Sequence, residues 1–219
     1  MADNLVSLFF DGELEDRTIT IDSYSIRIKC YNEDFAHYDG LTGHIPWVAA
    51  SPLSEFIVNN SSLFTDTEVI ELGSGLGISG IFSSFFSTRT FLTDYEDDIL
   101  LRLNDNISLN QDICSRIQIH KLDWTSSEDS SHLLSLLSPS TSRVIIGSDV
   151  VYQHGNVFHL CNAISQLIGN GVAFLVNSRC RFIGHRDDFY EHCHELDLEV
   201  QEFKHCSEAD LVWLKLYKS

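Results

Sequence analysis

A glycine-rich segment in the first half of the chain constrains its fold more than any other feature. The sequence E-L-G-S-G-L-G-I-S-G, residues 71–80, follows a short apolar run at 69–72 and leads into a helical pattern from Ile78. Glycines let the backbone turn tightly and let a ligand approach the main chain. The segment therefore predicts a strand, a ligand-binding turn and a helix in direct succession.

Strand and helix patterns alternate along most of the remaining chain. Their alternation predicts an open α/β sheet with crossover helices. The last two strands have no helix between them, so we expect one of them to be reversed at the edge of the sheet. The predicted strands are 69–72, 90–94, 117–122, 144–149, 171–176, 198–203 and 211–217, and the predicted helices are 78–86, 97–109, 157–168 and 186–196.

The N-terminal part differs from this α/β pattern. Residues 17–31 alternate apolar and polar side chains around an Asp-Ser turn, which predicts a β-hairpin with one buried face. A short helical pattern follows and ends near residue 60, and the serine-rich stretch 126–142 predicts a polar loop beside a short helix. We therefore expect one domain, residues 43–219, with a hairpin extension at 1–42.

The glycine motif by itself fits two ligands. Gly75-x-Gly77-x-x-Gly80, with Asp94 19 residues after Gly75, satisfies the dinucleotide fingerprint of NAD. Read from Glu71, the same run has the acidic-x-Gly-x-Gly-x-Gly arrangement that holds S-adenosylmethionine. Both ligands contain adenosine, so both need a carboxylate near the ribose hydroxyls. A glycine-rich turn without any ligand is the third reading.

Two further strand ends carry polar and aromatic side chains. Asp123 and Trp124 close the third strand, where the carboxylate could accept from an adenine amino group and the indole could pack on the ring. Ser148, Asp149 and Tyr152 close the fourth, where a carboxylate and a phenol could hold a cationic amine. The alternatives are structural: Trp124 in the core, Asp149 capping a turn and Tyr152 filling a wall.

With these motifs the chain resembles the class I, seven-strand methyltransferases, and among them the family-16 protein methyltransferases, which are mostly protein-lysine methyltransferases. The resemblance runs from about residue 43 to residue 217. It rests on G-x-x-x-W-x-x-A at Gly43, Trp47 and Ala50, on the 71–77 loop, on Thr93-Asp94, on Leu122-Asp123-Trp124 and on D-x-x-Y at Asp149 and Tyr152.

The resemblance implies a Rossmann-like sheet of seven strands with helices on both faces, an antiparallel last strand and a small N-terminal β-hairpin. It implies S-adenosylmethionine as the cofactor and S-adenosylhomocysteine as its product. Asp149 and Tyr152 would be the catalytic residues, while relatives often have alanine where this chain has Ser148. The cofactor-binding residues implied by the resemblance are Trp47, Gly73, Ser74, Gly75, Asp94, Trp124 and Ser148. From the motifs themselves we expect four more, Glu71, Gly77, Tyr95 and Asp123.

The charge balance restricts the partners. Only 14 Lys and Arg residues stand against 32 Asp and Glu residues, for a formal net charge of -18. This charge disfavours binding to nucleic acid and to anionic membranes and favours binding to basic protein segments. The alternative is that the acidity serves only to keep the protein soluble. The run at 96–98 would steer a basic segment or form an ordinary charge cluster at a helix start. Arg179 and Arg181 would order a substrate-facing loop, but we expect them to pair with local carboxylates.

Other signals point to an intracellular chain. The N-terminus lacks the basic region of a signal peptide, and no stretch approaches the roughly 18 apolar residues of a membrane span. The histidines and cysteines between residues 185 and 206 fit no zinc spacing, so we expect no metal. We expect a monomer in the cytoplasm, with the nucleus as the alternative compartment.

The resemblance thus implies an S-adenosylmethionine-dependent protein methyltransferase. The reaction that it implies is lysine N-methylation in a basic segment of a cytosolic protein, such as a chaperone, an ATPase or a translation factor. Three alternatives stay open. They are another acceptor (arginine, histidine or a small amine), an NAD-dependent oxidoreductase, and a non-catalytic binding module with the same fold.

Overall fold

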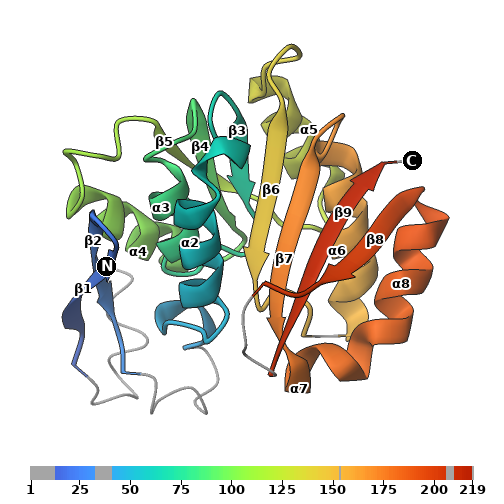
Figure 1. Cartoon of the computed structure of the whole chain (residues 1–219), viewed down its shortest axis with the longest axis horizontal. Coiled ribbons are helices and arrows are strands. Elements are labelled where there is room, and N and C mark those ends of the chain that lie inside the picture. Colours follow the sequence, from blue (N-terminus) through green and yellow to red (C-terminus); the bar gives the residue numbers. More distant parts are fainter. Residues whose placement is uncertain (1–12, 33–40, 153, 206–209, 219) are drawn as a thin grey trace.

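The computed structural model describes residues 13–32, 41–152, 154–205 and 210–218. Within them a seven-stranded sheet is flanked by helices on both faces, and a two-stranded sheet lies to one side (Figure 1). The predicted α/β fold is confirmed. The strands of the large sheet are β3 (Glu68–Glu71), β4 (Arg89–Asp94), β5 (Ile117–Lys121), β6 (Arg143–Ser148), β7 (Val172–Ser178), β8 (Leu198–Phe203) and β9 (Leu211–Lys218).

The strand order is β5-β4-β3-β6-β7-β9-β8. The five strands from β5 to β7 run parallel, whereas β9 is antiparallel to both β7 and β8. The antiparallel last strand is confirmed, but its expected place at the edge is wrong, because β9 lies inside the sheet. Burial explains this: five of the first six residues of β9 are buried, while β8 has one buried residue and serves as the edge.

The helices connect these strands. Those of the first half are α2 (Ala50–Asn59), α3 (Ile78–Ser83) and α4 (Asp97–Ser108), and those of the second half are α5 (Ser127–Leu136), α6 (His154–Leu167), α7 (Arg179–Phe182) and α8 (Arg186–Glu195). Short 3-10 turns lie at Thr42–His44, Ser61–Leu63 and Ile183–His185. The serine-rich stretch contains the ten-residue helix α5, whose start is capped by the Ser126 side chain. The helix predicted at 78–86 ends earlier, at Ser83.

Two apolar layers hold the helices on the sheet. On one face Ile70 and Ile145 pack with side chains of α5, α6 and α8. On the other face Val69 and Ile146 pack with α2, and α3 and α4 pack against Leu92. Because successive side chains of a strand point to opposite faces, a strand covered on both sides needs apolar residues on both, as the middle positions of β3 and β6 have, whereas polar residues stand at their ends.

The hairpin predicted at 17–31 is confirmed as β1 (Glu15–Ile21) and β2 (Tyr24–Cys30). Its buried face, with Ile26 and Ile28, joins the core cluster of α3 and α4. The side chain of Asn106 in α4 accepts from the backbone N–H of Lys29 at 2.8 Å and donates to the carbonyl of Leu76 at 3.0 Å. A single amide therefore links the hairpin to the glycine-rich loop.

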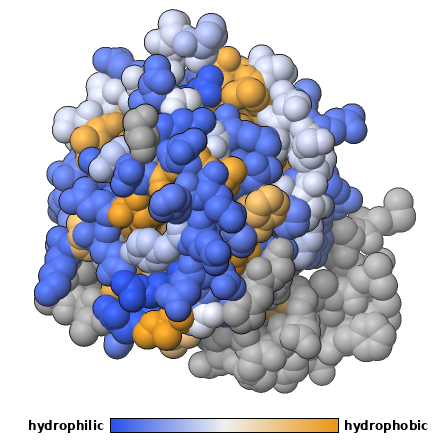
Figure 2. Space-filling model, turned by 90° about the vertical axis from the view of Figure 1, so that its right-hand side faces the viewer, coloured by the Kyte–Doolittle hydropathy of each residue, from blue (hydrophilic) through white to orange (hydrophobic). Residues whose placement is uncertain are grey.

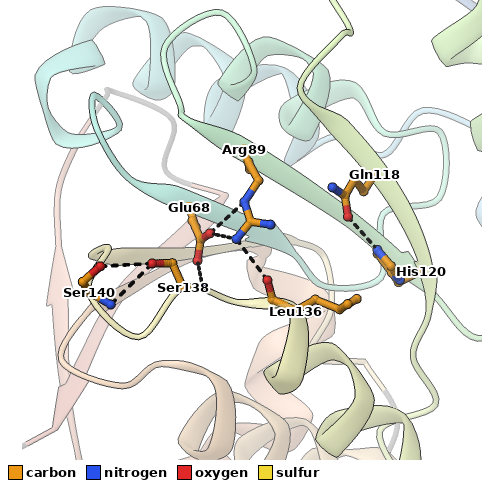
Figure 3. A network of polar contacts seen from close by, with 7 residues as sticks. All are labelled: Glu68, Arg89, Gln118, His120, Leu136, Ser138 and Ser140. Atoms are coloured by element: carbon orange, nitrogen blue, oxygen red, sulfur yellow. Dashed lines mark hydrogen bonds and ion pairs between the residues drawn. The ribbon is translucent and has the colours of Figure 1, made fainter.

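A buried ion pair fixes the amino-terminal ends of β3 and β4 (Figure 3). The carboxylate of Glu68 accepts from Nε of Arg89 at 2.8 Å and from the backbone N–H of Ser138 at 2.9 Å. The guanidinium of Arg89 also donates to the carbonyl of Leu136. This network ties the loop after α5 to the sheet at the end opposite to the glycine-rich loop.

One face of the molecule is largely polar. The face formed by the α8 and β8 side is mainly hydrophilic, with small separated hydrophobic patches (Figure 2). Among the described residues, no helix combines the length and apolar character needed to cross a membrane.

Candidate functional site

A cavity of about 350 Å³ opens at the carboxyl-terminal ends of the parallel strands. Its walls come from the glycine-rich loop, from the residues that follow β4, β5 and β6, from the segment that precedes α2, and from α7. Side chains at these strand ends converge because parallel strands end at the same edge of the sheet. Of the residues expected at a site, Gly77 alone lies outside the lining.

Three glycines of the loop have left-handed backbones, with φ of 57° at Gly73, 51° at Gly75 and 77° at Gly77. A Cβ on Gly73 would lie 3.5 Å from the Trp124 ring, and one on Gly75 would lie 3.2 Å from the carbonyl of Gly43. These two glycines keep the backbone open to the cavity. Gly77 instead precedes α3, and a Cβ there would lie 2.7 Å from Leu103, so its role is packing.

Glu71 lies at the end of β3 and contributes to the cavity lining, and its Oε2 atom lies against Gly80 of α3. Its side chain is 2% exposed, and its Oε2 atom has no hydrogen-bond partner among the described residues. Burial raises the pKa of Glu71 to about 8, although a hydrogen bond with Ser74 opposes the shift. The Ser74 hydroxyl also accepts from the backbone N–H of Thr93 at 2.9 Å, which joins the loop to β4.

Asp94 closes the glycine-rich loop from the end of β4. Its Oδ2 accepts from the Gly75 N–H at 3.0 Å and its Oδ1 from the Tyr95 N–H at 2.8 Å. Burial raises the pKa of Asp94, against the effect of these backbone donors. The carboxylate faces the cavity with lone pairs left for a ligand, and the exposed Tyr95 lies at its rim.

Asp123 and Trp124 form the wall beyond β5. The N–H and the hydroxyl of Thr125 donate to Asp123 at 2.9 and 2.7 Å, and they lower the pKa of that carboxyl. Trp124 is partly buried and packs on the core cluster of α5 and α6 while its ring borders the cavity. Trp124 is therefore both a core residue and a residue of the cavity wall.

Asp149 stands at the junction of three segments. It is 4% exposed and has φ of 55°, a left-handed conformation that aspartate tolerates better than most residues. Its Oδ2 accepts from the Ala49 N–H at 3.2 Å, and its Oδ1 accepts from the Ser178 N–H at 2.6 Å. The same carboxylate lines the cavity beside Ser148. It thus ties α2 to β7, as a structural residue does, and still reaches the site.

Tyr152, Trp47 and Arg181 form an aromatic and cationic group at the mouth. Burial raises the pKa of Tyr152, and the charges of Asp94 and Glu96 act in the same direction while Arg181 opposes them. The Arg181 guanidinium carbon lies 3.8 Å from the ring centroid of Trp47 and 5.6 Å from that of Tyr152. No carboxylate pairs with Arg181 among the described residues, so the expected local ion pair is wrong for this arginine.

The segment before α2 covers one side of the cavity, with Thr42, Gly43 and Trp47 in its lining. The Trp47 indole N–H donates to the Thr42 carbonyl at 2.7 Å, and His44 hydrogen-bonds to Asp98 at 3.1 Å. The sequence reasoning missed His44. Its partner is 54 residues away, and no spacing rule connects a turn histidine to a distant helix start.

The acidic run at the start of α4 is divided among separate tasks. Glu96 lines the cavity, Asp98 holds His44, and Asp97 pairs with Lys121 at 2.6 Å. Among the described residues, no three His, Cys, Asp or Glu side chains gather as metal ligands, and Cys206 lies outside the described residues.

Comparisons with known proteins agree with this geometry. A family model described as lysine methyltransferase matches residues 29–195. A Dictyostelium discoideum protein is 30% identical over 75% of this chain and 53% of its own length. The human protein-lysine N-methyltransferase EEF2KMT is 31% identical over 58% of this chain and 41% of its own length. The EEF1A lysine methyltransferase 3 of Xenopus tropicalis is 27% identical over 81% of this chain and 74% of its own length. The chain thus spans about half the length of the first two relatives.

The solved structures support the fold. A SAM-dependent methyltransferase from Anabaena variabilis superposes with a TM-score of 0.55, over 75% of this chain and 82% of that protein, at 15% identity.

Proposed function

Because the chain belongs to the lysine methyltransferase family, we propose that it is an S-adenosylmethionine-dependent protein-lysine N-methyltransferase. One observation carries the proposal. The glycine-rich loop, Asp94, Trp124, Asp149 and Tyr152 all line a single cavity. A cofactor-binding half and an acceptor-binding half are thereby within reach of one another, as the direct transfer of a group between two bound molecules requires.

The residues of the cavity fit S-adenosylmethionine. Its volume of about 350 Å³ lies within the range of small-molecule sites. Asp94 would hold the ribose hydroxyls, and Asp123 with Trp124 would hold the adenine. Gly73 and Gly75 leave the main chain bare for the close approach of a ligand.

The cofactor supplies an electrophilic methyl group on its sulfonium. The acceptor lysine of the substrate must therefore be in its neutral amine form when it reacts. A free lysine has a pKa near 10.4, so reaching the neutral form at pH 7 costs about 4.6 kcal/mol. Removing the amine from water in the cavity lowers its pKa and reduces this cost.

Asp149 and Tyr152 would orient that amine. Asp149 already accepts two backbone N–H groups, which offset part of its charge, so it can accept an amine N–H without holding an ammonium tightly. Burial raises the pKa of Tyr152 further above neutral pH, and the oxygen of the phenol can accept a second amine N–H. Two such acceptors would leave the nitrogen lone pair directed at the methyl group.

Calorimetric titrations test the cofactor. We expect S-adenosylmethionine and S-adenosylhomocysteine to bind with micromolar dissociation constants and NAD to show no binding. Asp94→Asn should weaken the adenosyl ligands by about tenfold or more. Asp97→Asn is the matched control, because Asp97 is exposed outside the cavity. Binding of NAD alone would favour the oxidoreductase alternative, and folded protein that binds none of these ligands would leave the binding-module alternative.

We further propose that the substrate is a basic segment of a cytosolic protein. The net charge of -18 supports a cationic partner. The printed names of two relatives, which cite EEF2 and EEF1A, make translation elongation factors the first candidates. A labelled methyl donor, incubated with recombinant elongation factors and then with lysate, tests this. Mass spectrometry then distinguishes lysine from arginine or histidine as the acceptor, and label on no protein would contradict the proposal.

We take the working unit to be a monomer in which residues 1–42 extend a domain of residues 43–219. Light scattering on the purified protein tests the first part. Limited proteolysis tests the second, since cleavage near residue 42 should release a folded fragment.

A further inference from the structure

The charges that line the cavity are unevenly divided. Five carboxylates contribute to the lining, those of Glu71, Asp94, Glu96, Asp123 and Asp149, whereas Arg181 is the one cationic side chain among the described residues that line it. An isolated cation among five carboxylates would be expected to pair with one of them. Arg181 pairs with none of them.

Three of the five carboxylates, those of Asp94, Asp123 and Asp149, have other partners. Asp94 accepts the N–H groups of Gly75 and Tyr95, and Asp149 accepts those of Ala49 and Ser178. Asp123 is likewise held by Thr125. These donors are parts of the folded backbone, so the carboxylates are fixed in place without the help of Arg181.

The guanidinium itself is fixed by an aromatic ring. Its carbon is 3.8 Å from the ring centroid of Trp47, and that indole is anchored by its own hydrogen bond to the Thr42 carbonyl. A guanidinium can stack on an aromatic face while its five N–H donors lie in its plane. Stacking therefore orients Arg181 and leaves its planar fork available for a bidentate acceptor.

We propose that Arg181, held against Trp47, is a receptor for a carboxylate that enters the cavity from outside the chain. Such an anion would be repelled by those lining carboxylates that are ionised unless a cation compensates, and Arg181 is placed to do so. This inference rests on the proposed function, which offers two sources: the carboxylate of the cofactor's methionine moiety and an acidic side chain next to the target lysine.

The first arm of the test uses S-adenosylhomocysteine and its decarboxylated analogue, which lacks only the carboxylate. If the cofactor is the source, Arg181→Gln weakens binding of S-adenosylhomocysteine tenfold or more and changes binding of the analogue less than twofold. Arg181→Lys, which keeps the charge but loses the fork, gives an intermediate loss. Arg179→Gln is the matched control, because Arg179 lies two residues earlier in α7, exposed and outside the lining.

In the second arm, two peptides are titrated into the complex of the protein with S-adenosylhomocysteine. Both have an acetylated N-terminus and a free lysine side chain, which is flanked by glutamates in one peptide and by glutamines in the other. If the substrate is the source, the wild-type protein prefers the glutamate peptide, Arg181→Gln removes that preference, and the affinity for S-adenosylhomocysteine stays unchanged. Thermal unfolding checks that each variant folds.

Two results would overturn the inference while leaving the proposed function intact. One is that Arg181→Gln and Arg179→Gln behave alike towards every probe. The other is that Arg181→Gln weakens S-adenosylhomocysteine and its decarboxylated analogue equally, because Arg181 would then act by packing rather than by binding a carboxylate. A wild-type protein that binds no adenosyl ligand overturns the proposed function, and this inference falls with it.

Discussion

At the scale of single residues, the site is built from side chains that also hold the fold together. Asp149 joins α2 to β7 through two backbone N–H groups, and Asp94 closes the glycine-rich loop in the same way. Loss of either carboxylate is therefore expected to change both stability and function, and substitutions must be designed to separate the two.

Asp149→Asn makes this separation. Asparagine keeps the size and tolerates the left-handed backbone, but its amide can satisfy only one of the two buried N–H donors, which costs about 1–3 kcal/mol in the free energy of unfolding. We expect methyl transfer to fall about 100-fold while the affinity for S-adenosylhomocysteine changes little. Asp22→Asn is the matched control, since Asp22 has φ of 51° on the exposed hairpin turn. Full turnover by Asp149→Asn with a confirmed substrate would exclude the assigned role.

Glu71 should make stability depend on pH. Its pKa rises from 4.5 to about 8 on folding, so between these values the unfolded state binds fewer protons than the folded state. The favourable contribution of protonated Glu71 is complete below pH 4.5 and is lost as pH rises towards 8. Urea unfolding of Glu71→Gln should therefore show a gain over wild type that grows across this window, to at most about 5 kcal/mol.

The exposed Glu55 of α2 provides the control for loss of a carboxylate, as Glu55→Gln. A difference between Glu71→Gln and wild type that stays constant from pH 5 to pH 9 would show that Glu71 ionises in the folded protein as it does in the unfolded chain.

At the scale of elements, the contact between α3 and the sheet is limited by one glycine. A Cβ on Gly80 would lie 2.1 Å from Leu92 of β4 and 2.5 Å from Oε2 of Glu71. Helix α3 starts directly after the glycine-rich loop, so any shift of the helix also moves the loop.

Gly80→Ala is expected to destabilise the protein by about 1–3 kcal/mol, because the added methyl group must displace packed side chains. Gly184→Ala is the matched control for Gly80→Ala. A Cβ on Gly184 would meet nothing within 4 Å, so that change should be neutral or stabilise by less than about 1 kcal/mol. Equal denaturation midpoints for the two variants in urea would refute the close-packing account of α3.

The sequence reasoning succeeded where the cause is local. Buried apolar runs predicted the central strands, and the loop from Glu71 to Gly80 predicted its own turn and the helix after it. It failed where the cause is distant. Arg181 stacks on Trp47 although the two residues are far apart in the sequence, and Asp149 accepts a hydrogen bond from Ala49, 100 residues before it. The order of β8 and β9 is a different case, because the local signal was present: Leu211–Lys218 is richer in apolar residues than Leu198–Phe203.

At the scale of the whole molecule, the excess of 18 negative charges acts on encounter with a substrate. Exposed charges are screened over about 10 Å at 0.1 M salt, so attraction of a basic segment should weaken as salt is added. We expect kcat/KM for a lysine-rich peptide to fall several-fold between roughly 0.05 and 0.3 M sodium chloride. A peptide with one lysine and neutral flanks should show little change. Equal salt dependence for both peptides would exclude steering.

The position of β9 has a consequence for how the protein is made. Residues 211–218 fill the gap between β7 and β8, so the ribosome delivers β8 before the strand that joins it to the sheet. Until β9 emerges, β7 presents an open edge of the kind that pairs with other chains. The nascent protein therefore has an incomplete sheet until residues 211–218 have been synthesised, a period in which a chaperone that shields strand edges would have most to protect.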